Sequence, residues 1–353
     1  MINPELKLNP KIFDKDVEQV PIRKGFGEGL LRAAERDKRI VGLCADLAES
    51  TCMNLFRDKF PERFVEVGVA EQNLASVASG MAAMGKIPFI GSFAIFSPCR
   101  NWEQIRTTIC YNNLPVKIVG SHAGLSASQD GGSHQMLEDI ALMRVLPRMT
   151  IISPCDAIEA KKATIFASKT DTPTYIRLTR NATPIITTEE SPFEIGRAQV
   201  VFDSNLNNQS GDKNPSPLRG TPFKKGDFHA SVCIIATGHL LYKALLVAKR
   251  LTDEGKGVIV VNLSTIKPLD ENTIIKVAQE VGAIVTVEEH QIIGGMGSAV
   301  AECLAGHIPV PIEFVGVNDK FGQSGQPEEL LDLYGLGEKD IYNAAKKAML
   351  RKR

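Results

Sequence analysis

The feature that most constrains the fold of this chain is a regular alternation of short, β-rich apolar runs with longer helical patterns. In the first half, the ranges expected as strands are 39–43, 87–91, 116–121, 150–153 and 174–178. The ranges expected as helices are 24–36, 72–84, 101–111, 136–146 and 157–168. Strands that alternate with helices of ~10–15 residues are typical of βαβ units, in which helices cover both faces of a mostly parallel sheet.

The same alternation resumes in the second half, after a polar interruption. The ranges expected there are strands at 232–237, 257–262, 283–288 and 312–317, and helices at 239–252, 270–280, 296–305 and 339–349. Between the halves, residues 203–227 are rich in Asn, Ser, Gly, Pro and charged residues, and they contain almost nothing to bury. We therefore predict an α/β protein with two doubly wound, mostly parallel-sheet domains, 20–190 and 231–353, joined by a linker or mobile loop over 191–230.

The composition excludes several classes of protein. The 353 residues include 41 Lys and Arg and 41 Asp and Glu, so the net charge of zero provides no basic footprint for nucleic acid. No apolar run approaches the ~20 residues of a membrane span, and the N-terminal residues include Glu5 and Lys7, which is not typical of a signal peptide. The 7 cysteines are scattered, without a C-x-x-C pair. This pattern indicates free thiols in a reducing compartment and predicts a cytoplasmic location.

Polar and aromatic side chains follow the predicted strands of the first half at the points where the strands end. Ligands bind at this edge of open parallel sheets, so we expect these side chains to converge. Taken alone, each has a plainer explanation: Asp46 could cap a helix, Asp130 could form a turn, and Phe93 could lie in the core. Together, on successive strand ends, they favour a binding site. Its candidate residues are Asp46, Ser50, Glu71, Phe93, Phe96, His122, Asp130, His134 and Arg180.

The usual signatures of nucleotide binding, nucleophilic catalysis and metal binding are missing from the sequence. It contains no G-x-x-x-x-G-K-[ST] loop, no strand–G-x-G-x-x-G–helix unit, no G-x-S-x-G elbow and no His/Cys cluster with metal spacing. The glycines at 294–297 open a predicted helix and could cradle an anion. Close packing of that helix on the sheet is the favoured explanation.

Several motifs in a fixed order give this candidate site a family resemblance. They are A-D-L-A-x-S at 45–50, G-V-A-E-Q at 68–72, S-F-x-x-F at 92–96, D-G-x-S-H-Q at 130–135 and R-x-L-P-x-M-x-I-I-x-P-x-D at 144–156. In this order they resemble the C-terminal half of a transketolase, which is its pyrimidine-binding domain followed by its C-terminal domain. The resemblance covers about residues 20–353 and is most specific over 20–185.

The resemblance also implies a missing part. A full-length transketolase has an N-terminal domain that holds the pyrophosphate of thiamine diphosphate and its divalent metal, and that carries a G-D-G motif followed by N-N. Here the comparable fragment, 226–228, lacks the second glycine of that motif. We therefore expect the second subunit of a split transketolase, which is inactive alone. Its partner would be an N-terminal-half subunit that holds Mg²⁺ or Ca²⁺, in a heterotetramer of two plus two chains. The expected reaction moves a two-carbon ketol unit between a ketose phosphate and an aldose phosphate, as in the pentose phosphate pathway.

The resemblance assigns roles residue by residue. Glu71 matches the glutamate that hydrogen-bonds the pyrimidine of thiamine diphosphate, and it is expected to be catalytic together with His134. Phe96 matches the aromatic residue that stacks on the pyrimidine, with Phe93 beside it, and Asp46 resembles the aspartate of the cofactor pocket. The residues expected to bind the sugar phosphate are Arg23, Ser50, His122, Asp130, His134 and Arg180. Guanidinium groups suit a phosphate ester because their planar fork donates to two oxygens at once.

Some departures from the family pattern leave the substrate open. The usual G-E-D-G reads S-Q-D-G at 128–131, Cys99 stands where many members have tyrosine, and A-G-L follows His122 where many transketolases have Asp-Ser. The last feature is similar to deoxyxylulose-phosphate synthases. The alternatives are a subunit of such a synthase, a β-type subunit of a 2-oxoacid dehydrogenase, and a non-catalytic paralogue. The stretch 130–144 favours the transketolase.

Overall fold

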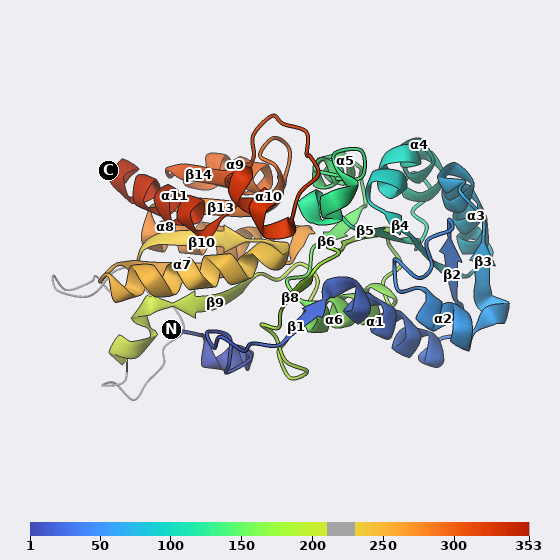
Figure 1. The fold of residues 1–353 in the computed structure, drawn as a ribbon, viewed down its shortest axis with the longest axis horizontal. Helices are drawn as coiled ribbons and strands as arrows, with labels where there is room; N and C mark the ends of the chain where they lie inside the picture. The colour runs from blue at the N-terminus through green and yellow to red at the C-terminus, as the bar shows by residue number, and fades with distance from the viewer. Residues whose placement is uncertain (210–229, 353) are drawn as a thin grey trace.

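The first half of the chain forms a seven-stranded sheet. The computed structural model describes residues 1–209 and 230–352, and it places this sheet next to a five-stranded one (Figure 1). The strand order is β12-β6-β7-β5-β4-β2-β3, and β12 alone runs antiparallel to its neighbour in this sheet. The strands are β2 (Ile40–Cys44), β3 (Phe64–Glu66), β4 (Ile87–Phe93), β5 (Lys117–Ser121), β6 (Thr150–Ile152), β7 (Thr174–Arg177) and β12 (Thr265–Lys267). Every residue of β2, β4, β5 and β7 is buried, because helices cover both faces of the sheet.

Helices lie on both faces of the seven-stranded sheet. One face is covered by α1 (Ile22–Arg36), α2 (Asn54–Lys59) and α6 (Ala157–Ala167), the other by α3 (Glu71–Ala83), α4 (Trp102–Gln104), the π-helical η4 (Ile105–Cys110) and α5 (Asp139–Arg144). Successive residues of a strand point to opposite faces of the sheet, so Ile40 packs in the same apolar cluster as α1 and Val41 packs in the same cluster as α3. Helix α1 approaches α6 closely at Gly25, where an added Cβ would lie 1.8 Å from the backbone oxygen of Ala157.

The second half forms the five-stranded sheet, with the order β14-β13-β10-β11-β9. Its strands are β9 (Gln199–Asp203), β10 (Ala230–Ala236), β11 (Gly257–Asn262), β13 (Ile284–Gln291) and β14 (Ile312–Val317), and β9 is antiparallel to β11. Its faces are covered by α7 (Leu241–Asp253) and α11 (Glu338–Arg351) on one side and by α8 (Glu271–Val281) and α9 (Met296–His307) on the other. One apolar cluster continues from α8 and α9 through Ile266 into the first sheet, so the two halves share a core.

Short elements complete the described part of the chain. A two-stranded ribbon pairs β1 with β8, and several short helices lie in the connections. These elements are η1 (Pro4–Leu6), β1 (Gln19–Pro21), η2 (Pro61–Arg63), η3 (Ile95–Arg100), η5 (Gly124–Asp130), β8 (Ala182–Pro184), η6 (Ser204–Gln209), η7 (Gly238–Leu240) and α10 (Pro327–Leu333). Within the described ranges, no helix combines the length and the apolar character that crossing a membrane requires.

The predicted α/β class with mostly parallel sheets is confirmed, and the expected strands lie within a few residues of the observed ones. The helix expected over 101–111 is instead a short α-helix followed by a π-helix, and the helix expected over 136–146 is limited to α5. Strand β9 lies inside the range 191–230 and pairs with the second sheet, while β12 returns from the second half to the first. Most of the polar excursion, 210–227, lies outside the described residues.

Candidate active site

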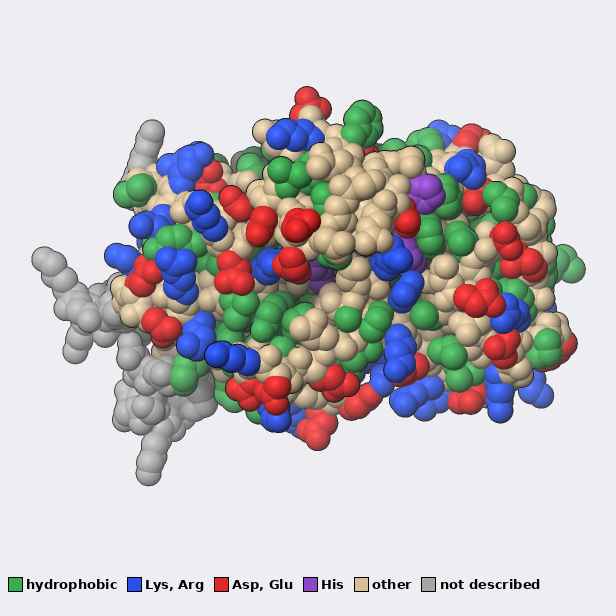
Figure 2. Space-filling model, in the orientation of Figure 1, with side chains coloured by type: hydrophobic (Ala, Val, Ile, Leu, Met, Phe, Trp, Pro, Cys, Tyr) green, Lys and Arg blue, Asp and Glu red, His purple; other side chains and the backbone are tan. Residues whose placement is uncertain are grey.

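The carboxyl ends of four neighbouring parallel strands, β7, β5, β4 and β2, carry most of the predicted site residues. Phe93 ends β4, His122 follows β5, and Arg180 lies shortly after β7. Glu71 begins α3, which leads from β3 to β4. Figure 2 shows histidine and Lys or Arg side chains close together on the face where the two halves of the molecule meet.

His122 lies at the centre of this edge, and its tautomer follows from its partners. Arg23 Nη1 lies 3.2 Å from His122 Nε2, and Ser121 Oγ lies 2.9 Å from His122 Nδ1. A guanidinium can only donate, so Nε2 accepts and the ring proton is on Nδ1, which donates to Ser121 Oγ. Burial, followed by the positive charges of Arg23 and Arg180, lowers the pKa of His122 to about 3. The imidazole therefore stays neutral at physiological pH.

Two arginines flank this imidazole. Arg23 also donates from Nη1 to the backbone oxygen of Ser50 at 2.9 Å, so Ser50 contributes its carbonyl to this contact and not its hydroxyl. Arg180 donates to the backbone oxygen of Ala127 at 3.3 Å, and its Nη1 lies 3.7 Å from Asp130 Oδ2. Both guanidinium groups act on the charge state of His122. The two guanidinium groups are positively charged and only donate hydrogen bonds, so they suit a phosphate ester, whose oxygens accept.

A row of rings connects the two predicted histidines. Phe93 stacks on His122 with ring centroids 3.8 Å apart, and it stacks on Phe96 at 5.8 Å with an interplanar angle of 10°. Phe96 in turn meets His134 edge-on at 5.5 Å. The structure therefore brings His122, Phe93, Phe96 and His134 together as one wall of the site.

Glu71 is buried at the end of this wall, where it meets a residue that the sequence analysis missed. Its side chain is 2% exposed, and its Oε2 accepts a hydrogen bond from Arg100 Nη1 at 2.9 Å. The same guanidinium lies over the ring of Phe96, with Cζ 4.7 Å from the centroid. Asn101 Nδ2 donates to the backbone oxygen of Glu71 at 3.0 Å and fixes the start of α3. A flat group with N–H donors therefore fits between Glu71 and Phe96, which are the two contacts that an aminopyrimidine would require.

Asp46 makes no hydrogen bond or ion pair with the other predicted site residues in the described structure. It is exposed, with φ 61°, and its backbone N–H donates to Glu66 Oε1 at 2.7 Å. Ser126, which the sequence analysis did not select, belongs to the site because its Oγ accepts from the backbone N–H of Arg180 at 3.1 Å. The S-F-x-x-F motif identified Phe93 and Phe96 from the sequence. Arg100 follows Phe96 by four positions in the same short helix, and a cation at this spacing from an aromatic residue was the signal that could have identified it.

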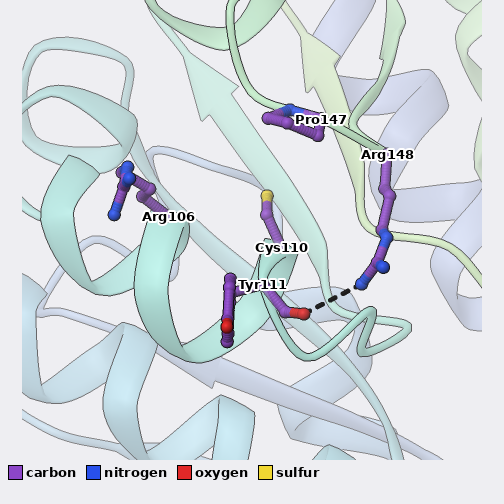
Figure 3. Close-up of a pocket in the computed structure, with 5 residues that line it drawn as sticks. All are labelled: Arg106, Cys110, Tyr111, Pro147 and Arg148. Atoms are coloured by element: carbon purple, nitrogen blue, oxygen red, sulfur yellow. Dashed lines mark hydrogen bonds between the residues drawn. The ribbon is translucent and has the colours of Figure 1, made fainter.

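A cavity of about 520 Å³ lies elsewhere, and none of the predicted site residues lines it. It is lined by residues of η4 and its C-terminal end and by the segment before β6, namely Arg106, Cys110, Tyr111, Pro147 and Arg148 (Figure 3). Arg148 donates to the backbone oxygen of Tyr111 at 2.8 Å. These segments precede β5 and β6, so the cavity lies toward the amino ends of the strands, opposite the candidate site.

Two α/β domains with an acid, stacked rings and imidazoles at the strand ends define a recognisable class, and comparisons with known proteins identify it. Residues 18–185 match the family "Transketolase, pyrimidine binding domain", and residues 227–341 match "Transketolase, C-terminal domain". The chain belongs to the transketolase family. The predicted resemblance to the C-terminal half of a transketolase is confirmed by these matches.

The similar proteins include separate subunits of about the same length. The chain is 38% identical over 340 residues to a 6-deoxy-6-sulfo-D-fructose transketolase subunit from Clostridium sp. (strain MSTE9), covering 96% of this chain and 98% of that one. It is 40% identical over 323 residues to a putative transketolase C-terminal section from Methanocaldococcus jannaschii, covering 91% of this chain and 93% of that protein.

A solved structure extends this similarity to the fold. A split gene transketolase, described as an inactive β4 tetramer, superposes with a TM-score of 0.82 at 41% identity, covering 95% of this chain and 100% of that one. Transketolase from Campylobacter jejuni matches at a TM-score of 0.73 and 20% identity, which shows the shared fold, and the match spans 49% of that chain.

Proposed function

We propose that this chain is the second subunit of a split, thiamine-diphosphate-dependent transketolase, which moves a two-carbon ketol unit between a ketose phosphate and an aldose phosphate. The observation that carries the proposal is that the buried Glu71 carboxylate faces a flat group, the Arg100 guanidinium, which also lies over the ring of Phe96. The positively charged Arg23 lies at the other end of the same wall, beside His122. The alternatives of a synthase-like or dehydrogenase-like subunit are less favoured, because the subunit from Clostridium sp. named above is a transketolase subunit.

Thiamine diphosphate would supply the carbanion chemistry when it is bound. In this proposal Glu71 holds a hydrogen bond to the pyrimidine ring, Phe96 lies against that ring, and Phe93 supports Phe96 from behind. Arg100 would leave the place it occupies between Glu71 and Phe96. Asp46, exposed at the end of β2, would complete the cofactor pocket together with the partner chain.

The substrate phosphate would be bound by Arg23, Arg180, Ser50 and His122. Since the pKa of His122 is lowered to about 3, the positive charge comes from the arginines. The neutral imidazole would donate to the phosphate from Nε2, with its proton moved there from Nδ1. Asp130 and His134, on the loop after β5, would contact the sugar hydroxyls. His134 would hold or move a proton at its free ring nitrogen, because its Nδ1 lies 3.0 Å from Ser133 Oγ.

The diphosphate and the metal would be held by an N-terminal-half partner subunit, with Mg²⁺ or Ca²⁺, in a complex of two plus two chains. Among the described residues, no group of three or more His, Cys, Asp and Glu side chains is arranged to hold a metal ion. The length of the similar subunits supports a two-chain enzyme. The seven cysteines are all free, which supports a cytoplasmic location.

The donor and acceptor sugars are proposed separately, because the similar subunits are named for different substrates. One relative is named for a sulfosugar. Another, 33% identical over 327 residues, is an apulose-4-phosphate transketolase subunit from Phocaeicola vulgatus. We propose xylulose 5-phosphate and ribose 5-phosphate, the pair of the pentose phosphate pathway, as the first substrates to test. 6-Deoxy-6-sulfofructose serves as the competing donor.

The test mixes this chain with an N-terminal-half partner, thiamine diphosphate and Mg²⁺, and follows product formation from each donor. We expect turnover from the mixture, none from this chain alone, and a loss of at least about a hundredfold in Glu71→Ala, since one positioned acid–base group contributes ~10²–10⁴ in rate. Glu62→Ala, a change at a side chain 68% exposed on η2, is the matched control. Turnover by this chain without a partner, or full activity of Glu71→Ala, would contradict the proposal.

A further inference from the structure

A carboxylate of the second half contacts the substrate loop of the first half. Glu289, on β13, is 3% exposed, and its Oε1 accepts a hydrogen bond from the backbone N–H of Leu125 at 2.8 Å. Its Oε2 lies 2.9 Å from His239 Nε2, which therefore donates. One carboxylate is held on one side by its own domain, through His239, and uses its other oxygen to hold η5 of the neighbouring domain.

The loop is shaped to receive this carboxylate. Gly124, at the start of η5, has φ +70°, a conformation that favours glycine. A Cβ at this position would lie 2.4 Å from Cδ of Glu289, so the carboxyl group occupies space that any side chain at 124 would fill. The glycine thus serves both the backbone conformation and the approach of Glu289.

The segment that Glu289 holds is the one that positions Arg180. Ser126 Oγ accepts from the backbone N–H of Arg180, the carbonyl of Ala127 accepts from its guanidinium, and Asp130 lies 3.7 Å from it. All three contacts come from η5, directly after Leu125. Movement at Leu125 would therefore be passed to the guanidinium through these three contacts.

A second contact between the halves holds the far end of the same loop. Gln135 Nε2 donates to the backbone oxygen of Gln323 at 3.0 Å and to that of Ser128 at 3.1 Å. Gly132 lies so close to this segment that an added Cβ would be 2.5 Å from the backbone oxygen of Gly322. The loop over 124–135 is thus fixed at both ends by the C-terminal half.

We propose that Glu289 is a positioning residue for substrate binding, through which the C-terminal domain holds η5 and hence Arg180 in place for the sugar phosphate. The assignment of the phosphate to Arg180 rests on the proposed function, whereas the mechanical link from Glu289 to η5 does not. This gives the C-terminal domain a definite task in a site to which it contributes no residue that we expect to contact cofactor or substrate.

The experiment compares Glu289→Ala with Glu289→Gln, which keeps an oxygen to accept from Leu125. The matched control is Glu313→Ala, because Glu313 is a largely buried carboxylate of the same domain that pairs with Lys347 and Arg351 and has no contact with η5. Hydrogen exchange over 124–131 is measured on the chain itself. Steady-state kinetics and cofactor affinity are measured on the two-chain complex.

For Glu289→Ala we expect faster exchange over 124–131 and a KM for the sugar phosphates raised about tenfold, the equivalent of one charge-assisted hydrogen bond. The value of kcat and the affinity for thiamine diphosphate should change less than about threefold, and Glu289→Gln should restore most of both readouts. Gly124→Ala, which blocks the same contact from the loop side, should reproduce the KM effect even if Glu289→Ala folds poorly.

Unchanged exchange over 124–131 in both Glu289→Ala and Gly124→Ala would overturn the positioning role. So would equal effects of Glu289→Ala and Glu313→Ala on KM. If the wild-type complex turned over no sugar phosphate, the proposed function would fail while the exchange experiment still tested the link to η5. The two failures are therefore distinguishable.

Discussion

Arg100 lies where we expect the cofactor ring, so Arg100→Ala should increase the affinity of the two-chain complex for thiamine diphosphate. In the free chain, Glu71 loses its charged partner when the guanidinium is removed. In the loaded enzyme, the cofactor ring replaces the guanidinium and the variant loses nothing. The substitution therefore raises the free energy of the cofactor-free state only. The binding free energy of the cofactor becomes more favourable by the amount that the contacts of Arg100 contributed to that state.

The magnitude follows from the exposure of the two side chains. Glu71 is 2% exposed but Arg100 is 50% exposed, so the ion pair is screened on one side and contributes roughly 1 kcal/mol. The guanidinium over Phe96 adds about 0.5 kcal/mol, the value typical of an exposed cation–π contact. A total of about 1.5 kcal/mol corresponds to an approximately tenfold lower Kd.

The assay is calorimetric titration of thiamine diphosphate into the two-chain complex with Mg²⁺, alongside denaturant unfolding of this chain alone. We expect the chain alone to lose about 1.5 kcal/mol of stability, matching the gain in affinity, because both report the same contacts. Arg106→Ala is the control, because it removes the same charge from η4 and its guanidinium has no hydrogen-bond or ion-pair partner among the described residues. A weaker affinity in Arg100→Ala would refute the reasoning, because it would mean that Arg100 contacts the bound cofactor.

Three further changes test the fold around the site. Asp139→Ala should lower the free energy of unfolding by about 3–5 kcal/mol in denaturant unfolding, because the buried guanidinium of Arg177, whose Nε lies 2.8 Å from Asp139 Oδ2, loses its partner. A decrease below about 1 kcal/mol would contradict this reasoning. Gly25→Ala should destabilise the chain by about 1–3 kcal/mol by forcing α1 away from α6, whereas Gly80→Ala, with open space around it, should cost nothing. The pKa of His122 is lowered to about 3 in the folded chain, below its unfolded value of about 6.5, so the folded state binds fewer protons. The stability that the chain gains from keeping His122 neutral should be complete above pH ~6.5, and it should fall by up to ~1.4 kcal/mol per pH unit as the pH is lowered below that value. His122→Asn should flatten this dependence of the unfolding free energy on pH. An unchanged dependence below pH ~6.5 in the variant would exclude the burial effect.

The sequence predicted those parts of the structure that leave a local pattern. The buried strands β2 and β4 read as largely apolar runs, and β5 and β7 each contain a shorter apolar pair between polar ends. The residues after them could be assigned to one edge because parallel strands end together. Strand β12 has three residues, and the apolar run of strand β9, 200–202, is equally short and lies beside the polar excursion, so neither is long enough for a sequence pattern to separate from a loop.

The missed parts of the site depend on contacts between distant residues. Glu289 contacts Leu125 across 164 positions of sequence, and such a pair leaves no periodic signal. Arg100 is close in sequence to Phe96, but its partner Glu71 belongs to another helix, so its role depends on the packing of α3 against η3. The resemblance to a family supplied roles for single residues, whereas the partners of those residues required the folded chain.

Strand β12 has a consequence for any attempt to separate the two halves. It covers the outer edge of β6, and next to it Ser264 accepts from the backbone N–H of Ser153 at 2.7 Å, while Lys267 Nζ donates to the carbonyls of Arg144 and Leu146. A fragment that stops near residue 190 would expose β6 as an open edge, and open edges recruit strands from other molecules. A chimaera built from the halves of two relatives must therefore take residues 264–267 and β6 from the same relative. This short segment belongs to the second half in sequence but completes the sheet of the first half.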